Sequence, residues 1–328
     1  MSPIARARIP AIAACVAVAF AAGAHAQGGA WPARPVRIVA AQQAGSATDS
    51  IARALADALA EAWGKPVVVE NRVGASGAIG TVVVARAAPD GYTLLVGGLS
   101  NLVTSPLLEP SYGVDPEQSF VPIGRVAFVP FVVGIHHDVP AATLQDFVAH
   151  VRRHPGSVVF ATSGPTAFSR LCIELLALEQ RLDLLTVEYK SGPAATLDLV
   201  AGRAQLHVSE IASMKSYADA GKIRLLAIAG NRRSGLLPGV PTFAEAGGVD
   251  IPMTPWYGVL APAGVPPDVL ARLEDGYREA MRDPRLLQRI EALGYEPIVD
   301  GPGAFAAALK RDITEVRTIA RRLGRAAN

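Results

Sequence analysis

The chain has little cysteine and little net charge, and each shortage excludes a class of protein. Two cysteines among 328 residues are too few for a disulfide scaffold or a Cys-rich zinc module. A formal charge of +2 gives no electrostatic basis for binding nucleic acid. Half of the residues are apolar, which excludes an intrinsically disordered chain. A chain of this length can bury either one very large core or two medium ones.

Long apolar runs are confined to the first 26 residues. Two arginines precede the apolar stretch Ile9–Ala22, and Ala24–Ala26 follows as a small-x-small cleavage site. This layout predicts a secretory signal peptide over residues 1–26, with cleavage after Ala26. An alternative takes Ile12–Cys15 as a lipoprotein box with Cys15 as the lipidation site. That alternative leaves only about six apolar residues before the cysteine, fewer than the roughly 7–15 expected there.

Removal of this segment changes the charge and the thiol content of the chain. It takes away two arginines and no acidic residue, so the mature chain is formally neutral. The remaining thiol, Cys172, shares an apolar helical spacing with Phe168, Leu171 and Leu175, which favours a buried structural thiol over a nucleophile. No later apolar run approaches 18 residues, so no further membrane span is predicted.

Short β-rich runs alternate with helical patterns through the rest of the chain. The run Val36–Ala40, for example, is followed by Thr48–Trp63, in which apolar residues recur every four positions. Such alternation predicts an α/β fold with largely parallel sheets and covering helices.

Two β-rich, proline-punctuated segments interrupt the alternation, at Phe120–Ile135 and Ile251–Ala261. After the second segment the chain becomes mostly helical. Two lobes crossed twice by the chain fit this pattern. Lobe I would comprise residues 31–127 plus 256–328, and lobe II residues 128–255.

Three loops share one design, in which a strand leads through a turn rich in Gly, Ser and Thr to a helix. They are Gln42–Asp49, Thr162–Ser169 and Lys190–Pro193. Such turns present unpaired backbone N–H groups and the positive end of a helix dipole, which makes them anion sites. Ordinary helix capping explains any one of them. Two such loops in different lobes nevertheless favour a ligand held in an interlobe cleft.

The loops also carry specific local predictions. Ser46 is expected to cap its helix and Asp49 to return a hydrogen bond, as in a capping box. Pro193 suits the first helical position of the third loop. Lys190 could pair with an acidic ligand, and a surface lysine at a helix start is an equal alternative.

Motifs of common enzyme and metal sites are missing as well. The chain has no Walker A sequence and no G-x-S-x-G elbow, and the glycines of Gly74–Gly80 do not match a dinucleotide fingerprint. His150 and His154 lack a third ligand and indicate a solvated basic face. His136 and His137 are adjacent at a strand end, so they are expected to point to opposite faces. No catalytic residue, cofactor or metal site is predicted.

A series of motifs in fixed order runs from Trp31 to about Ala320. They include Trp31–Val39, Val67–Arg72, Ala87–Leu95, Ala218–Ala227, Leu237–Gly247 and Trp256–Gly264. In these motifs the chain resembles the extracytoplasmic substrate-binding receptors of the tripartite tricarboxylate transporter family, also called Bug-type receptors.

The resemblance implies a periplasmic, type 2-like binding protein with two α/β lobes, a ligand cleft and two crossing hinge segments, near Phe128–Val133 and Thr254–Gly258. It implies a small carboxylate ligand (a di- or tricarboxylate, an aromatic acid or an amino acid) held by backbone amides, hydroxyls and water. The partners would be the membrane permease subunits of such a transporter, or a sensor protein. A non-enzymatic monomer that binds no nucleic acid is expected.

The ligand-binding residues expected from the loops and the resemblance come from three places. They are Gln42, Gln43, Gly45, Ser46, Ala47, Thr48 and Asp49 in the first loop, Thr162, Ser163, Gly164, Thr166 and Ser169 in the second, and Lys190 in the third. The alternative is a hydrolase or lyase acting on a carboxylate in the same cleft. Its catalytic groups would be Tyr189, Lys190, Asp49 and Ser169.

The chain departs from the family pattern inside these loops. The family's first loop usually reads Pro-Phe-Pro-Pro-Gly-Gly-x-Thr-Asp, whereas residues 41–49 replace two prolines and the pocket-lining aromatic with two glutamines and small residues. Pro165 and Thr166 stand where Asn-Gly is usual, and Ser209 where Asp is common. These changes concern ligand identity, because glutamine can donate and accept hydrogen bonds where an aromatic ring only packs.

Overall fold

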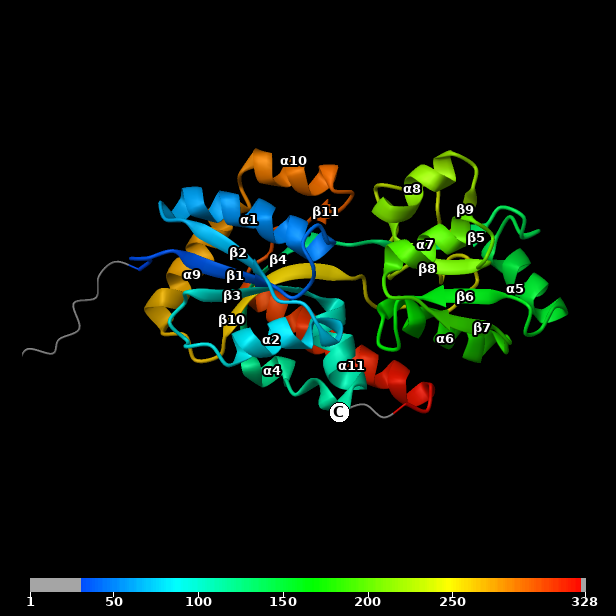
Figure 1. The fold of residues 1–328 in the computed structure, drawn as a ribbon, viewed down its shortest axis with the longest axis horizontal. Coiled ribbons are helices and arrows are strands. Elements are labelled where there is room, and N and C mark those ends of the chain that lie inside the picture. Colours follow the sequence, from blue (N-terminus) through cyan, green and yellow to red (C-terminus); the bar gives the residue numbers. More distant parts are fainter. Residues whose placement is uncertain (1–30, 326–328) are drawn as a thin grey trace, which may run out of the picture.

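The computed structural model describes residues 31–325 and shows two lobes, each built around one β-sheet with helices on both faces (Figure 1). The predicted signal peptide and Cys15 lie outside the described residues. Within residues 31–325, no helix combines the length and apolar character needed to cross a bilayer.

The first lobe holds a six-stranded sheet in the order β11-β4-β10-β3-β1-β2. Its strands are β1 (Val36–Ala40), β2 (Val67–Asn71), β3 (Thr93–Gly98), β4 (Phe120–Phe128), β10 (Trp256–Pro262) and β11 (Glu296–Pro297). β1 lies parallel between β2 and β3, where Val39 pairs with Glu70 on one side and Leu95 on the other. β10 runs antiparallel to both β3 and β4.

Helices cover both faces of this sheet because its central strands are apolar on both faces. Val36 and Ile38 pack with α1 (Ala47–Trp63), α9 (Pro267–Ala280) and α10 (Pro284–Ala292). Val39 belongs to the core on the opposite face, with α2 (Ala78–Ala85) and α11 (Pro302–Arg322). The remaining helical segments of this lobe are Ala75–Gly77, Ser100–Thr104, α3 (Ser105–Leu108), Pro110–Tyr112 and α4 (Pro116–Ser119).

The second lobe holds a five-stranded sheet in the order β7-β6-β8-β5-β9. Its strands are β5 (Phe131–His136), β6 (Val159–Thr162), β7 (Leu185–Glu188), β8 (Leu206–Glu210) and β9 (Ile223–Ala229). Its helices are α5 (Leu144–Arg153), α6 (Phe168–Gln180), α7 (Gly192–Val200) and α8 (Ile211–Asp219). Val133 packs on the face with α5 and α6, and Val132 on the face with α7 and α8.

The chain changes sheets twice. β4 ends in the first sheet at Phe128 and β5 begins in the second at Phe131; β9 ends at Ala229, and the chain returns to the first sheet as β10 at Trp256. These crossings orient both sheets. β10 starts at the crossing, and β3 runs antiparallel to β10, so β3 ends on the interlobe side. β1 and β2 run parallel to β3 and therefore end on the same side. In the second sheet β5 starts at the crossing, and β8 runs antiparallel to β5, so β8 ends on the interlobe side. β6 and β7 run parallel to β8 and end on that side too.

The sheets are mixed, which corrects the prediction of largely parallel sheets. The antiparallel pairs are those made by β4, β5, β10 and β11, and β4, β5 and β10 are the strands next to the crossings. β5 and β10 begin at the crossings, so each runs opposite to its neighbouring strands, which end there. The predicted burial of Cys172 is confirmed, and desolvation raises the pKa of its thiol, so it is no nucleophile.

Candidate functional site

The first loop connects β1 to α1 and is closed by its own hydrogen bonds. Ser46 caps α1, as predicted, accepting a hydrogen bond from the backbone N–H of Asp49 at 3.3 Å. The Asp49 carboxylate accepts a hydrogen bond from the backbone N–H of Gly45 at 2.9 Å, and not from that of Ser46. The reciprocal half of the predicted capping box was therefore wrong by one residue, because the Ser46 N–H turns inward to the carbonyl of Gln43.

Asp49 is also the centre of a wider polar network. Its Oδ1 accepts from Asn71 Nδ2 at 2.9 Å and pairs with Arg53 at 2.9 Å, and Asn71 donates on to the carbonyl of Gln42 at 3.0 Å. Desolvation alone would raise the pKa of this carboxyl, but the hydrogen bonds from Arg53, Gly45 and Asn71 outweigh it and lower the pKa. Asp49 is thus a permanent anion that fixes the loop.

The other residues of the first loop differ in exposure. Gln42 and Gln43 are exposed, Ala47 is half-buried, and Thr48 is only 2 % exposed. Gly45 has a φ of +79°, in the region that favours glycine, so the turn that presents its N–H depends on this residue.

The second loop connects β6 to α6. α6 begins at Phe168 after Ala167, which supplies no side-chain cap, so its first N–H groups remain available to other acceptors. Gly164 has a φ of +134° and open space around its α-carbon. Thr162 and Ser169 are buried, whereas Ser163 is exposed.

Thr166 points out of this loop toward the first lobe. Its carbonyl accepts from Thr104 Oγ1 at 2.7 Å, and its hydroxyl lies 2.9 Å from Ser105 Oγ at the start of α3. This predicted ligand residue therefore joins the two lobes directly.

The third loop lies at the end of β7. Lys190 is exposed, and no acidic side chain among residues 31–325 forms an ion pair with it. Ser191 caps α7, and Pro193 takes the second helical position instead of the predicted first. Tyr189 donates its hydroxyl proton to Asp198 at 2.7 Å.

A fourth strand-to-helix turn, from β8 to α8, was missed in the sequence. Glu210 ends β8, and its Oε2 accepts from the hydroxyl of Tyr295 in the first lobe at 2.8 Å. Burial raises the pKa of the Glu210 carboxyl, an effect that this hydrogen bond only partly offsets. The ring of Tyr295 lies 6.3 Å from that of Tyr257. The run Ser209-Glu210 between a predicted strand and helix was the signal that could have found it.

His136 and His137 differ from their predicted arrangement. Their ring centroids lie 4.3 Å apart, because the chain leaves β5 at His136 and turns, so the two side chains are not on opposite faces. With Asp138 they place ligand atoms within 4.8 Å of one another, a donor set that suits a divalent metal ion. The group lies at the end of β5 away from the crossing.

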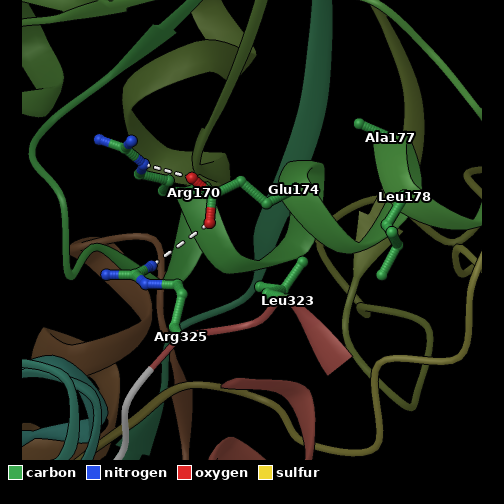
Figure 2. A pocket seen from close by; sticks show the side chains of 6 residues that line it. All are labelled: Arg170, Glu174, Ala177, Leu178, Leu323 and Arg325. Carbon is green, nitrogen blue, oxygen red and sulfur yellow. Dashed lines mark hydrogen bonds and ion pairs between the residues drawn. The ribbon is translucent and has the colours of Figure 1, made fainter. Parts of the chain in front are cut away.

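Two cavities are lined by none of the predicted ligand-binding residues. Arg170, Glu174, Ala177, Leu178, Leu323 and Arg325 line one of about 450 Å³ between α6 and the chain end after α11. Figure 2 shows Arg170 and Arg325 turned toward Glu174, which pairs with both. The second, of about 270 Å³, lies beside α9 and the start of α11 and includes Tyr277 and Asp300 in its lining.

Comparison with known proteins adds the decisive observation. The family model described as "Tripartite tricarboxylate transporter family receptor" matches residues 51–321. The chain belongs to this family. The resemblance seen in the sequence is thereby confirmed, and so is the two-lobed α/β fold expected from it. These family proteins are periplasmic solute-binding receptors.

Individual receptors of the family agree over most of the chain. BugT of Bordetella pertussis is 31 % identical over 295 residues, covering 90 % of each chain. Rpa4515 of R. palustris, solved with adipate, is 28 % identical with a TM-score of 0.81, covering 90 % of this chain and 99 % of that one. MatC of Rhodopseudomonas palustris, solved with malate, is 27 % identical with a TM-score of 0.77, covering 88 % and 99 %.

Proposed function

We propose that this receptor binds a small carboxylate between its lobes. The observation that carries the proposal is the orientation of the two sheets, since the parallel strands of both end on the interlobe side. Ligands of open α/β sheets bind outside the carboxyl ends of the strands. The loops after β1 and β6 lead there into α1 and α6, whose N-termini favour an anion. The adipate and malate bound to two relatives support a carboxylate.

The proposed contacts are the predicted residues of the first two loops, with backbone N–H groups as the main donors. The Asp49 network would hold the first loop in its binding conformation before the ligand arrives. Lys190 is exposed at the same sheet edge and could add one charge at the entrance. Thr166 contributes to lobe contact.

We propose that the lobe boundaries lie at the crossings, near residues 128 and 255, and that Phe128–Val133 and Thr254–Gly258 act as the hinge. The lobes touch on both flanks. Arg232 and Ser234 bind Glu296 on one flank, and Arg325, beyond α11, binds Glu174 of α6 on the other. These contacts support the assignment of the present arrangement as the closed form.

The receptor would act after secretion and cleavage at Ala26, as a monomer, and deliver its ligand to permease subunits or to a sensor. It would carry out no catalysis. Two of the catalytic groups of the hydrolase alternative already have structural partners. Asp49 accepts hydrogen bonds from Arg53, Gly45 and Asn71, which favour its carboxylate form, and the Tyr189 hydroxyl donates a hydrogen bond to Asp198. No observation therefore favours the hydrolase.

Native mass spectrometry of the mature protein, followed by thermal unfolding with candidate acids, tests the proposal. A true ligand at 100 times its Kd should add about 2.7 kcal/mol to the free energy of unfolding. X-ray scattering should show a smaller radius of gyration with ligand than without. If no acid in a broad panel raises the Tm, the ligand class is wrong; if a bound acid is consumed by pure protein, the receptor is an enzyme.

A further inference from the structure

Glu210 lies at the same edge of the second sheet as the proposed ligand loop. β8 and β6 are parallel neighbours in which Ala161 pairs with His207. Continuing this register places Thr162 beside Val208, so Glu210 lies two positions farther toward the interlobe side, level with the second loop. Phe131, the first residue after the crossing, pairs with Glu210 on the other side. Glu210 is thus between the loop and the proposed hinge.

The charge of Glu210 has no counter-charge among residues 31–325. No lysine, arginine or histidine described in the structure forms an ion pair with it, and its Oε1 accepts no hydrogen bond from a described residue. The groups that hydrogen-bond it are neutral: the hydroxyl of Tyr295 donates to its side chain from the first lobe, and Ser213 on α8 donates to its backbone carbonyl at 2.8 Å. Glu210 is half-buried, and a carboxylate partly withdrawn from water is destabilised unless a cation offsets the loss of hydration.

Tyr295 packs in turn against a second tyrosine of the first lobe. The ring of Tyr257, at the start of β10, meets that of Tyr295 edge-on, at 73° and 6.3 Å. A carboxylate whose side-chain partner is a neutral tyrosine hydroxyl has the chemistry of an ammonium site, because its negative charge attracts a cation and its other oxygen can accept the ammonium hydrogen bonds. Glu210 is level with the second loop, which leads to α6, and the N-terminus of a helix attracts an anion.

An ionised Glu210 would repel a ligand that carries only negative charge. Glu210 and the helix N-terminus together suit a ligand with both charges. Resting on the proposed function, we infer that Glu210 binds the ammonium group of an amino acid or related amino-carboxylate, whose carboxylate is held by the helix N-termini of α1 and α6. The receptor would then discriminate amino acids from the matched acids that lack the amine.

Matched ligand pairs test this inference on the mature protein. L-glutamate and glutarate, L-aspartate and succinate, and L-phenylalanine and 3-phenylpropanoate differ by one amine each. Calorimetry with wild type should show at least tenfold tighter binding of the amino member of the pair that fits. Glu210→Gln keeps the shape and a hydrogen-bond acceptor for Tyr295, and should reduce that preference at least tenfold.

Two control variants separate recognition from structure. Glu188→Gln removes a carboxylate at the same sheet edge that is already ion-paired with Arg170, and should leave the preference unchanged. Tyr295→Phe removes the hydrogen bond across the lobes but keeps the carboxyl group of Glu210. It should therefore weaken the binding of both ligands of a pair by the same factor and leave the ratio of their affinities unchanged.

Three outcomes would overturn the inference. Parallel losses for both members in Glu210→Gln would assign the residue a purely structural role. Wild-type binding of the des-amino acids with equal or greater affinity would reject the ammonium subsite and leave the carboxylate receptor standing. Binding of no acid of either kind would reject the receptor function together with the inference.

Discussion

At the residue scale, Asp49 determines the shape of the first ligand loop. The sequence predicted that Ser46 and Asp49 would exchange hydrogen bonds, because their spacing is that of a capping box. It could not predict the contact to Asn71, which lies on β2 and is brought near only by the β1–β2 pairing. The pair with Arg53, four positions on in the same helix, is visible in the sequence and was missed. Asp49 therefore fixes three segments of chain at once.

We expect Asp49→Ala to lower the free energy of unfolding by about 2–3 kcal/mol, because it leaves Arg53, Asn71 and the Gly45 N–H without their charged acceptor. Ligand affinity should fall with it. Chemical denaturation measures the loss. Asp57→Ala is the control on the same helix, where an exposed pair with Arg289 should contribute less than about 1 kcal/mol. Equal losses would contradict a special role for Asp49.

His207 makes the second lobe sensitive to acid. It is 1 % exposed, and its Nδ1 donates to the carbonyl of Ala161 at 2.7 Å. Burial lowers its pKa from 6.5 to about 4. Between these values the unfolded chain binds a proton that the folded chain does not. Stability is therefore fully present above about pH 6.5 and falls by about 3 kcal/mol as the pH drops to about 4.

Unfolding of His207→Asn measured from pH 7 to pH 4 checks this. Asparagine keeps a donor near the Ala161 carbonyl and does not titrate, so the fall in stability over this range should shrink. An unchanged profile in the His207 variant would show that other groups cause the acid sensitivity.

At the element scale, most helices and strands could be predicted, because their apolar periodicity reflects the sheet faces and helix stripes that the fold buries. The four-residue spacing of Ile51 to Trp63 belongs to a single helix, α1. Strand direction could not be read this way. The segment 120–135 reads as one β-rich run, yet it holds two strands in different sheets, separated by Val129 and Pro130. Periodicity reports burial and carries no information on the partner strand.

Packing of α1 on α9 supplies an element-scale prediction. A Cβ on Gly276 would lie 1.8 Å from Trp63 Nε1 and 2.6 Å from Cε2. Alanine is favoured over glycine inside a helix by about 1 kcal/mol, but this overlap must push the helices apart. We therefore expect Gly276→Ala to destabilise by about 1–3 kcal/mol.

Thermal unfolding of Gly276→Ala measures this loss of stability, and Gly303→Ala is the comparison variant. Gly303 also lies in a helix, α11, and its Cβ would meet nothing within 4 Å, so that variant should be neutral or more stable by up to about 1 kcal/mol. If both variants behave alike, the contact between Trp63 and α9 is looser than the structure shows.

At the scale of the whole molecule, the sequence predicted two lobes and two crossings but none of the contacts between the lobes. Those contacts join residues far apart in the chain, such as Ser105 with Thr166 and Glu210 with Tyr295. No periodicity or short motif reports them. The equilibrium between the open and closed lobes, on which ligand affinity depends, is therefore set by contacts that only the structure reveals.

The end of the chain gives the most direct test of that equilibrium. α11 packs under the first sheet, and its last residue, Arg322, pairs with Glu179. Beyond α11, Arg325 pairs with Glu174 at 3.3 Å (Figure 2) and also donates to the carbonyl of Pro165 at 2.8 Å. Partly exposed pairs contribute up to about 1 kcal/mol each. Without them the closed population should fall, and the apparent affinity falls with that population.

We expect the Arg322→Ala, Arg325→Ala double variant to bind ligand about fivefold more weakly, the equivalent of about 1 kcal/mol, and to show a larger radius of gyration without ligand. Added salt should weaken wild type toward the variant and affect the variant less, because salt screens the same ion pairs. Arg285→Ala, which breaks exposed pairs to Glu61 and Asp283 within the first lobe, is the control and should leave scattering and affinity unchanged. Unchanged affinity and size in the double variant would mean that closure depends on the ligand and the Thr166 contact, without help from the chain end.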